Sequence, residues 1–86
     1  MEVLGRDSAR EAYRVAVDGT GRRIVGLIPD AVISRNMRLT GGRGHQTAYE
    51  WLSRNSRDIE TALHALREGR KTLARPFDQV VLEEDA

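Results

Sequence analysis

Apolar and polar residues alternate along two neighbouring segments near the start of the chain. Residues 13–18 place a tyrosine and two valines at every second position, the period that a half-buried strand requires. Residues 22–28 are rich in isoleucine, valine and leucine, and the intervening segment 18–21 holds two glycines that suit a tight turn. The pattern therefore predicts a β-hairpin over residues 13–28.

The spacing of apolar residues then changes to that of helices. Pro29 and Asp30 end the second strand and open a short helix over residues 30–38. Three glycines within residues 40–44 interrupt it. A longer helix is predicted over residues 46–69, with an apolar stripe formed by Ala48, Leu52, Ile59, Ala62, Leu63 and Leu66.

Asn55 falls in the middle of this apolar stripe. A buried asparagine in one long helix would need hydrogen-bond partners, and it can fix the register of the packing. The same residue can instead mark a kink between two shorter helices. The sequence leaves both alternatives open.

A last β-branched segment closes the predicted fold. Residues 77–82 predict a strand that returns to the hairpin after a connector over residues 70–76. The order β-β-α-α-β implies an α+β, two-layer domain in which two helices pack on a three-stranded antiparallel sheet. We expect residues 1–10 to be a flexible N-terminus, residues 11–83 to form a single domain and residues 84–86 to be an acidic tail.

A set of apolar positions and one acidic triplet between residues 13 and 67 follow a further pattern. Its members are Val15, Val17, Gly21, Ile28, Ile33, Met37, Leu52, the triplet at residues 58–60, Leu63 and Leu66. On these residues the chain resembles a family of short bacterial proteins, a domain of unknown function with a hairpin, a short helix, a long helix and a closing strand. The resemblance implies this fold and brings no activity with it.

Composition excludes several classes of protein. With 86 residues the chain makes one domain, and without cysteine it has no disulfide scaffold, thiolate zinc site or thiol nucleophile. No apolar run approaches the roughly 20 residues of a membrane span, and the first ten residues do not form a secretory signal. We therefore expect a cytoplasmic protein that makes no membrane contact.

Catalytic and metal-binding patterns are not recognisable. Neither His45 nor His64 has a nucleophile at the spacing of a known catalytic motif. Glu60, His64 and Glu68 have the helical spacing of metal ligands, but the same spacing is ordinary on a charged helix surface. We predict that the chain is not an enzyme and has no catalytic residue, metal or cofactor.

Aromatic residues give the favoured functional interpretation. Tyr49 and Trp51 flank the apolar stripe of the longer helix, and tryptophan and tyrosine are common anchors of protein interfaces. The sequence therefore predicts a non-catalytic protein-interaction or accessory module. Its partner would be another protein or a second copy of the chain, bound through these residues and the neighbouring edge strand.

Arginine supplies the alternative. Thirteen of the 14 basic residues are arginine, although the net charge is only +1. Local clusters could grip the phosphates of a nucleic acid or another anion, more weakly than a general polyanion-binding protein does. The hairpin carries Arg22 and Arg23, and the candidate contacts of this alternative are Arg35, Arg38, Arg43, His45, Arg70 and Lys71.

Overall fold

The fold is that of a computed structural model, which describes residues 1–19, 21–40, 44–70 and 75–83, without the side chains of residues 36–40 and 44–46. The predicted α+β class is confirmed. In chain order the elements are β1 (Glu2–Asp7), β2 (Ala12–Gly19), β3 (Arg22–Pro29), α1 (Asp30–Thr40), α2 (Gly44–Arg54), α3 (Ser56–Arg67), the short 3-10 helix η1 (Phe77–Gln79) and β4 (Val81–Leu82).

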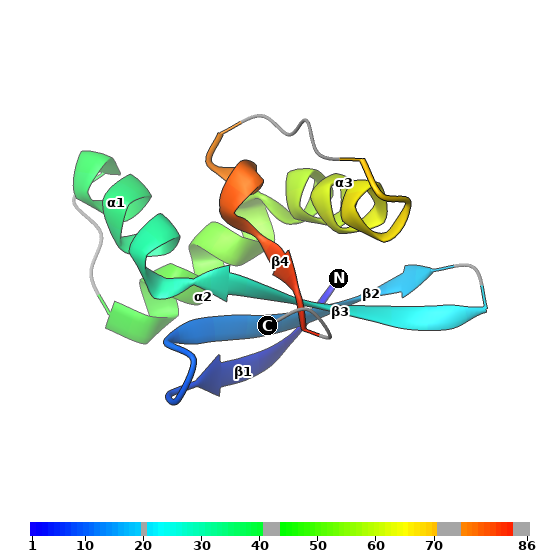
Figure 1. Cartoon of the computed structure of the whole chain (residues 1–86). Helices are drawn as coiled ribbons and strands as arrows, with labels where there is room; N and C mark the ends of the chain where they lie inside the picture. The colour runs from blue at the N-terminus through cyan, green and yellow to red at the C-terminus, as the bar shows by residue number, and fades with distance from the viewer. Residues whose placement is uncertain (20, 41–43, 71–74, 84–86) are drawn as a thin grey trace.

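The strands form one antiparallel sheet in the order β1-β2-β3-β4. The three α-helices lie on one side of this sheet, and β4 descends from that side to pair with β3 (Figure 1). The prediction of three strands is wrong, because β1 adds a fourth strand at the edge of the hairpin. The predicted closing strand is also shorter than expected, since its first residues form η1.

Strand β1 occupies residues that the sequence predicts to be a flexible N-terminus. It is held by apolar contact, because Met1 and Val3 are partly buried and pack against the core. Polar contacts add to this: Glu2 pairs with Arg23, and Nε of Arg6 donates a 3.0 Å hydrogen bond to Asp30 at the start of α1. These partners are distant in sequence, so the pattern of apolar and polar residues over 1–10 alone does not reveal that this segment is held as a strand.

The predicted hairpin is confirmed in position. Strands β2 and β3 pair along their whole length, from Ala12 opposite Pro29 to Gly19 opposite Arg22. Gly21, in the connecting turn, has a φ of 73°, a conformation that residues with a Cβ rarely adopt. The hairpin is thus the long central unit of the sheet, and β1 and β4 cover only parts of its two outer edges.

Asn55 separates two helices where the sequence left open one helix or two. Its backbone N–H and its side-chain Nδ2 both donate to the carbonyl oxygen of Trp51, at 3.0 Å and 2.8 Å. Its own carbonyl accepts from the N–H of Ile59 at 3.0 Å and so begins α3. The amide side chain therefore finds its partner in the preceding turn, and the chain bends between α2 and α3.

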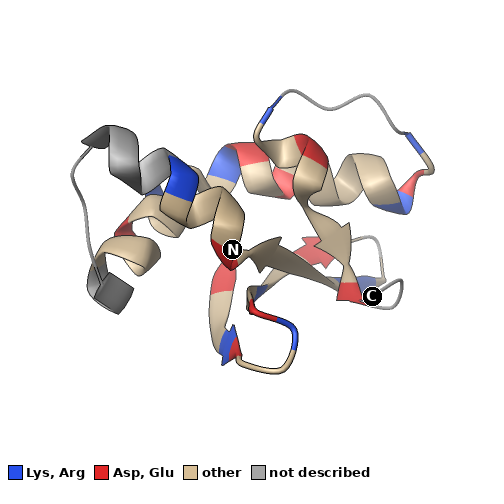
Figure 2. Cartoon of the chain, turned by 60° about the vertical axis from the view of Figure 1, so that its left-hand side comes forward, with Lys and Arg blue, Asp and Glu red and all other residues tan. Residues whose placement is uncertain are grey.

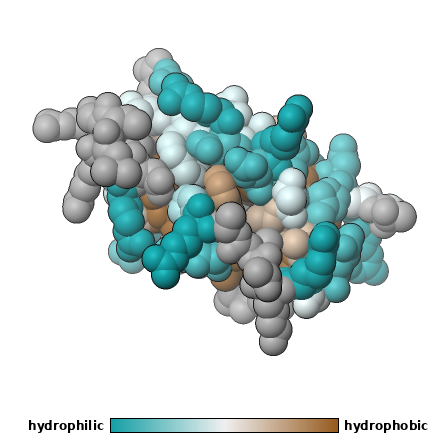
Figure 3. Space-filling model, turned by 90° about the horizontal axis from the view of Figure 1, so that it is seen from above, coloured by the Kyte–Doolittle hydropathy of each residue, from teal (hydrophilic) through white to brown (hydrophobic). Residues whose placement is uncertain are grey.

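The core lies between the sheet and the helices. Alternate residues of β2 and β3 contribute to it from below, and α1, α2 and α3 contribute from above; its largest fully buried members are Val15, Ile28, Val32, Leu52, Ile59, Leu63 and Val80. Seen from the helix side, the molecule is mostly hydrophilic, with hydrophobic residues in small areas only (Figure 3). The predicted apolar stripe of residues 48–66 therefore faces the sheet, as amphipathic helices do.

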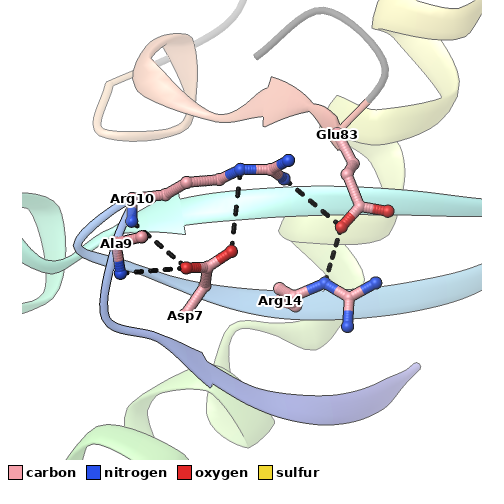
Figure 4. A network of polar contacts seen from close by, with 5 residues as sticks. All are labelled: Asp7, Ala9, Arg10, Arg14 and Glu83. Carbon is pink, nitrogen blue, oxygen red and sulfur yellow. Dashed lines mark hydrogen bonds and ion pairs between the residues drawn. The ribbon is translucent and has the colours of Figure 1, made fainter.

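The opposite face of the sheet carries a polar network instead of a helix (Figure 4). Nε of Arg14 donates to Oε1 of Glu83 at 2.6 Å, and Arg10 lies within ion-pair distance of both Glu83 and Asp7. Asp7 also accepts from the backbone N–H groups of Ala9 and Arg10. This network joins the β1–β2 turn to the residue after β4.

Candidate functional site

The predicted aromatic residues do not form one binding surface. Trp51 is half-buried, packs against the core and stacks on Phe77, with ring centroids 6.2 Å apart. Tyr49 is 40% exposed, and its ring meets that of Tyr13 edge-on at 5.6 Å. Trp51 thus serves packing between α2 and η1, and Tyr49 keeps one side open to solvent.

The predicted basic contacts are described only in part. Arg35 is exposed on α1, and Arg70 is exposed after α3, where it pairs with Glu68 at 2.9 Å. These two elements lie at opposite ends of the molecule (Figure 1), so the structure does not bring the two arginines together. The other predicted contacts lie outside the described part, as whole residues (Arg43, Lys71) or as side chains (Arg38, His45).

The structure instead singles out one half of β3. Strand β4 pairs with β3 only at Gly26 and Leu27. On this side, among the residues that the structure describes, no strand pairs with the preceding segment Arg22–Val25, which we call the open half of β3. Among the described residues, its outward backbone groups therefore face no paired strand.

Two hollows border the open half of β3. The tip hollow, of about 210 Å³, is lined by residues from the end of the hairpin and from the C-terminal end of α3: Gly19, Arg22, Ile24, His64, Arg67 and Glu68. The edge hollow, of about 150 Å³, is lined by Arg23, Ile24, Val25, Arg67, Leu82 and Glu83. Ile24 and Arg67 belong to both, so the two hollows follow the strand edge from the hairpin tip toward β4.

The carboxylates that line these hollows are held by arginines from outside them. Glu68 pairs with Arg70, and Glu83 accepts a hydrogen bond from Arg14. That bond, with the nearby charge of Arg10, lowers the pKa of Glu83 below its usual value. In the described part of the chain, Arg22 makes no ion pair.

Other strand edges are less suited to accept a partner strand. The outer edge of β1 is irregular, because the register shifts between Val3 and Gly5, and such bulges disfavour edge-to-edge pairing. On the side of β1, strand β2 is uncovered only at Val17–Gly19. The open half of β3 is longer by one residue and regular in its pairing with β2.

Metal and membrane sites have no support from the geometry of the described residues. Nowhere in the described ranges do three or more histidine, aspartate or glutamate side chains gather in a way that could hold a metal ion. No described helix combines the length and the apolar character needed to cross a membrane.

A third hollow, of about 300 Å³, lies near Glu2, Asp18 and Glu60 at the uncovered end of β2.

Searches of protein-family models, curated proteins and solved structures find no match to the chain. The resemblance to a bacterial family therefore stays a prediction.

The sequence does show Arg22 and Arg23 on the hairpin, but nothing in it places Arg67 beside them. That proximity depends on how α3 crosses the sheet.

Proposed function

We propose that the chain is a non-catalytic protein-interaction module that binds an extended segment of another protein along the open half of β3. The observation that carries the proposal is the early end of β4. This strand leaves Arg22–Val25 without a neighbour in the described part, directly beside two hollows. A partner segment would lie beside Arg22–Val25 as a fifth strand, end to end with β4.

Strand addition suits this edge for a physical reason. Main-chain hydrogen bonds supply affinity that depends little on sequence, and pockets beside the edge select alternate side chains. Here Ile24 belongs to the core and Val25 is half-buried, so the strand to be extended is itself firmly held. A bound segment would meet a rigid template and would be the only part that must become ordered.

The charge of the edge argues against a second copy of the chain as the partner. Antiparallel pairing of this segment with itself would bring Arg22 and Arg23 of both copies into one short ribbon. Charges of one sign that lie within a Debye length of each other repel, so this ribbon would be disfavoured. A different protein with a neutral or acidic segment fits better than a homodimer.

A peptide selection tests the proposal. Random 12-residue peptides displayed on phage would be selected on the immobilised full chain, and the recovered peptides titrated against ¹⁵N-labelled protein. We expect the largest amide shifts at Arg22–Val25 and at the flanking residues of β4. Failure to recover any binder, or shifts centred on β1 or on Tyr49, would contradict this assignment.

Nucleic-acid or anion binding is the second candidate, and Arg22 and Arg67 at one hollow are the observation that favours it. Basic and acidic segments are interspersed over helices and strands (Figure 2), so a broad surface of one sign is not seen in that view. A gel shift with random RNA and DNA at low salt separates the candidates. A shift that disappears with added salt and with R22Q would support this second function.

A further inference from the structure

We infer that residues 77–83, which comprise η1, β4 and Glu83, form a strap that opens and recloses while the rest of the sheet stays folded, and that the ion pair between Glu83 and Arg14 favours the closed form. Opening of the strap would extend the open half of β3 to Leu27. The opening is a property of the free chain, whereas this consequence for binding rests on the proposed function.

The backbone of the strap is attached to the sheet over a short length. Strand β4 pairs with β3 only at Gly26 and Leu27, whereas β2 and β3 pair along their whole length. Within the described part of the chain, the other backbone hydrogen bonds of the strap join residues within 76–80 to one another. Opening therefore breaks a two-residue ladder and leaves the hairpin and its pairing with β1 intact.

The apolar contacts of the strap are also few. Within residues 77–83 only Val80 and Leu82 are buried, Val81 is exposed, and Phe77 stacks on the half-buried Trp51. Helix α3 also packs directly on β2 and β3, so its place on the sheet does not depend on the strap. Segments with few buried apolar contacts open at a lower free energy than the whole fold.

An ion pair fixes the far end of the strap to the sheet (Figure 4). Nε of Arg14 donates to Oε1 of Glu83 at 2.6 Å, and Arg10 lies 3.4 Å from the same oxygen. Arg14 belongs to β2 and Arg10 to the turn before it, so both contacts are broken when the strap leaves the sheet. The other ion pair of the strap in the described part, between Asp78 and Arg75, is local. Removing the charge of Glu83 should therefore favour the open form.

Opening changes the edge that β3 offers to a partner. With β4 in place, only Arg22–Val25 faces no paired strand in the described part; with β4 displaced, Gly26 and Leu27 become part of the same edge. The edge then runs from Arg22 to Leu27, about six residues, which is a usual length for a strand. The ion pair of Glu83 thus regulates how far a bound segment can pair along β3.

Amide hydrogen exchange under native conditions tests the opening in the free chain. The amides that bond across the β3–β4 pair should exchange faster than the slowest amides of β2, because the latter exchange only when the whole sheet unfolds. In E83Q the β3–β4 amides should exchange roughly two- to fivefold faster than in the parent chain, as expected for the loss of a partly exposed ion pair. Unchanged exchange in E83Q would show that Glu83 does not hold the strap closed.

Two variants in β1, at the other edge of the sheet, serve as controls. E2Q removes the ion pair of Glu2 with Arg23, and V3A removes an apolar contact of β1 with the core. Both contacts persist when the strap opens. V3A should therefore speed the slowest β2 amides, and both variants should leave the β3–β4 amides unchanged. Equal acceleration of the two sets of amides in V3A would show that the strap opens only with the whole fold and would overturn the inference.

The best peptide from the selection tests the consequence for binding. It should bind E83Q roughly two- to fivefold more tightly than the parent chain or E2Q, with amide shifts that extend to Gly26 and Leu27. Equal affinity for all three chains, with shifts confined to Arg22–Val25, would overturn the regulation and leave strand addition in place. If no peptide binds this edge, strand addition is wrong and the regulation with it, while the exchange comparison still decides whether the strap opens.

Discussion

The side chain of Leu63 in α3 lies directly against the Cα of Gly26 in β3. A Cβ at residue 26 would overlap Cδ2 of Leu63 and would lie 3.0 Å from its Cδ1 and 3.1 Å from its Cγ. Leu63 is fully buried, so it has little room to move aside. The absence of a side chain at Gly26 therefore sets how closely α3 approaches the sheet, and with it the position of Arg67 one turn later.

Gly26→Ala should destabilise the fold because it places a methyl group in filled space. Overpacking of this kind typically costs about 1–3 kcal/mol. Urea unfolding of the variant and the parent chain measures the loss. In the double variant G26A/L63V the smaller side chain makes room, so the two changes together should cost less than the sum of each alone. Strict additivity would show that the contact with Leu63 is not the cause.

The ion pair between Arg14 and Glu83 should make stability depend on pH. The pKa of Glu83 lies below its ordinary value of 4.5, first because of the hydrogen bond from Arg14. The carboxylate therefore contributes its full stabilisation above pH 4.5, and this contribution is lost as the pH falls through the lowered pKa.

Glu83→Gln removes this titration and serves as the comparison. The parent chain should be more stable than E83Q at pH 7, and the difference should shrink as the pH falls from 4.5 to 3. Denaturant unfolding at several pH values measures both chains. A difference that stays constant over this range would show that Glu83 makes no stabilising ion pair.

Phe77→Ala should expose Trp51, the single tryptophan of the chain. The change removes the ring that stacks on Trp51, so the emission should shift to the red, and unfolding should cost about 1–2 kcal/mol less free energy. D78A, in the same short helix, is the control and should leave the emission unchanged. Emission of the parent chain that shifts on dilution would instead identify Trp51 as an interface residue.

The hairpin could be predicted because its signal is local. Alternation over residues 13–18 and glycines in the turn specify β2 and β3 without reference to the rest of the chain. Strand β1 could not, because its sequence, with Val3 and Leu4 adjacent and polar residues or glycine elsewhere, does not alternate, although its burial does. Its polar partners, such as Arg23 and Asp30, are also distant in sequence.

The bend at Asn55 was only half predictable for a similar reason. The sequence shows a polar residue within an apolar stripe, but whether its amide bonds within its own helix or across to another element depends on packing. The structure gives it the carbonyl of Trp51 one turn back.

The candidate site is the least predictable feature. It depends on where β4 stops along β3 and on where the end of α3 lies over the hairpin, and both are long-range contacts. The sequence names Arg22 but gives no reason to join it to Arg67. The sequence instead favours Tyr49 and Trp51, because tryptophan and tyrosine are enriched at protein interfaces on average. That enrichment does not tell which aromatic rings are needed for the packing of the core.

Amide hydrogen exchange along β3 tests the open edge most directly. In the free chain, the amides of Gly26 and Leu27 lie where strands flank β3 on both sides, whereas the outward amides of Arg22–Val25 face no strand in the described structure. We expect those outward amides to exchange rapidly in the free protein and to become protected when a selected peptide binds. Slow exchange throughout Arg22–Val25 in the free chain, or no gain of protection on binding, would contradict the account.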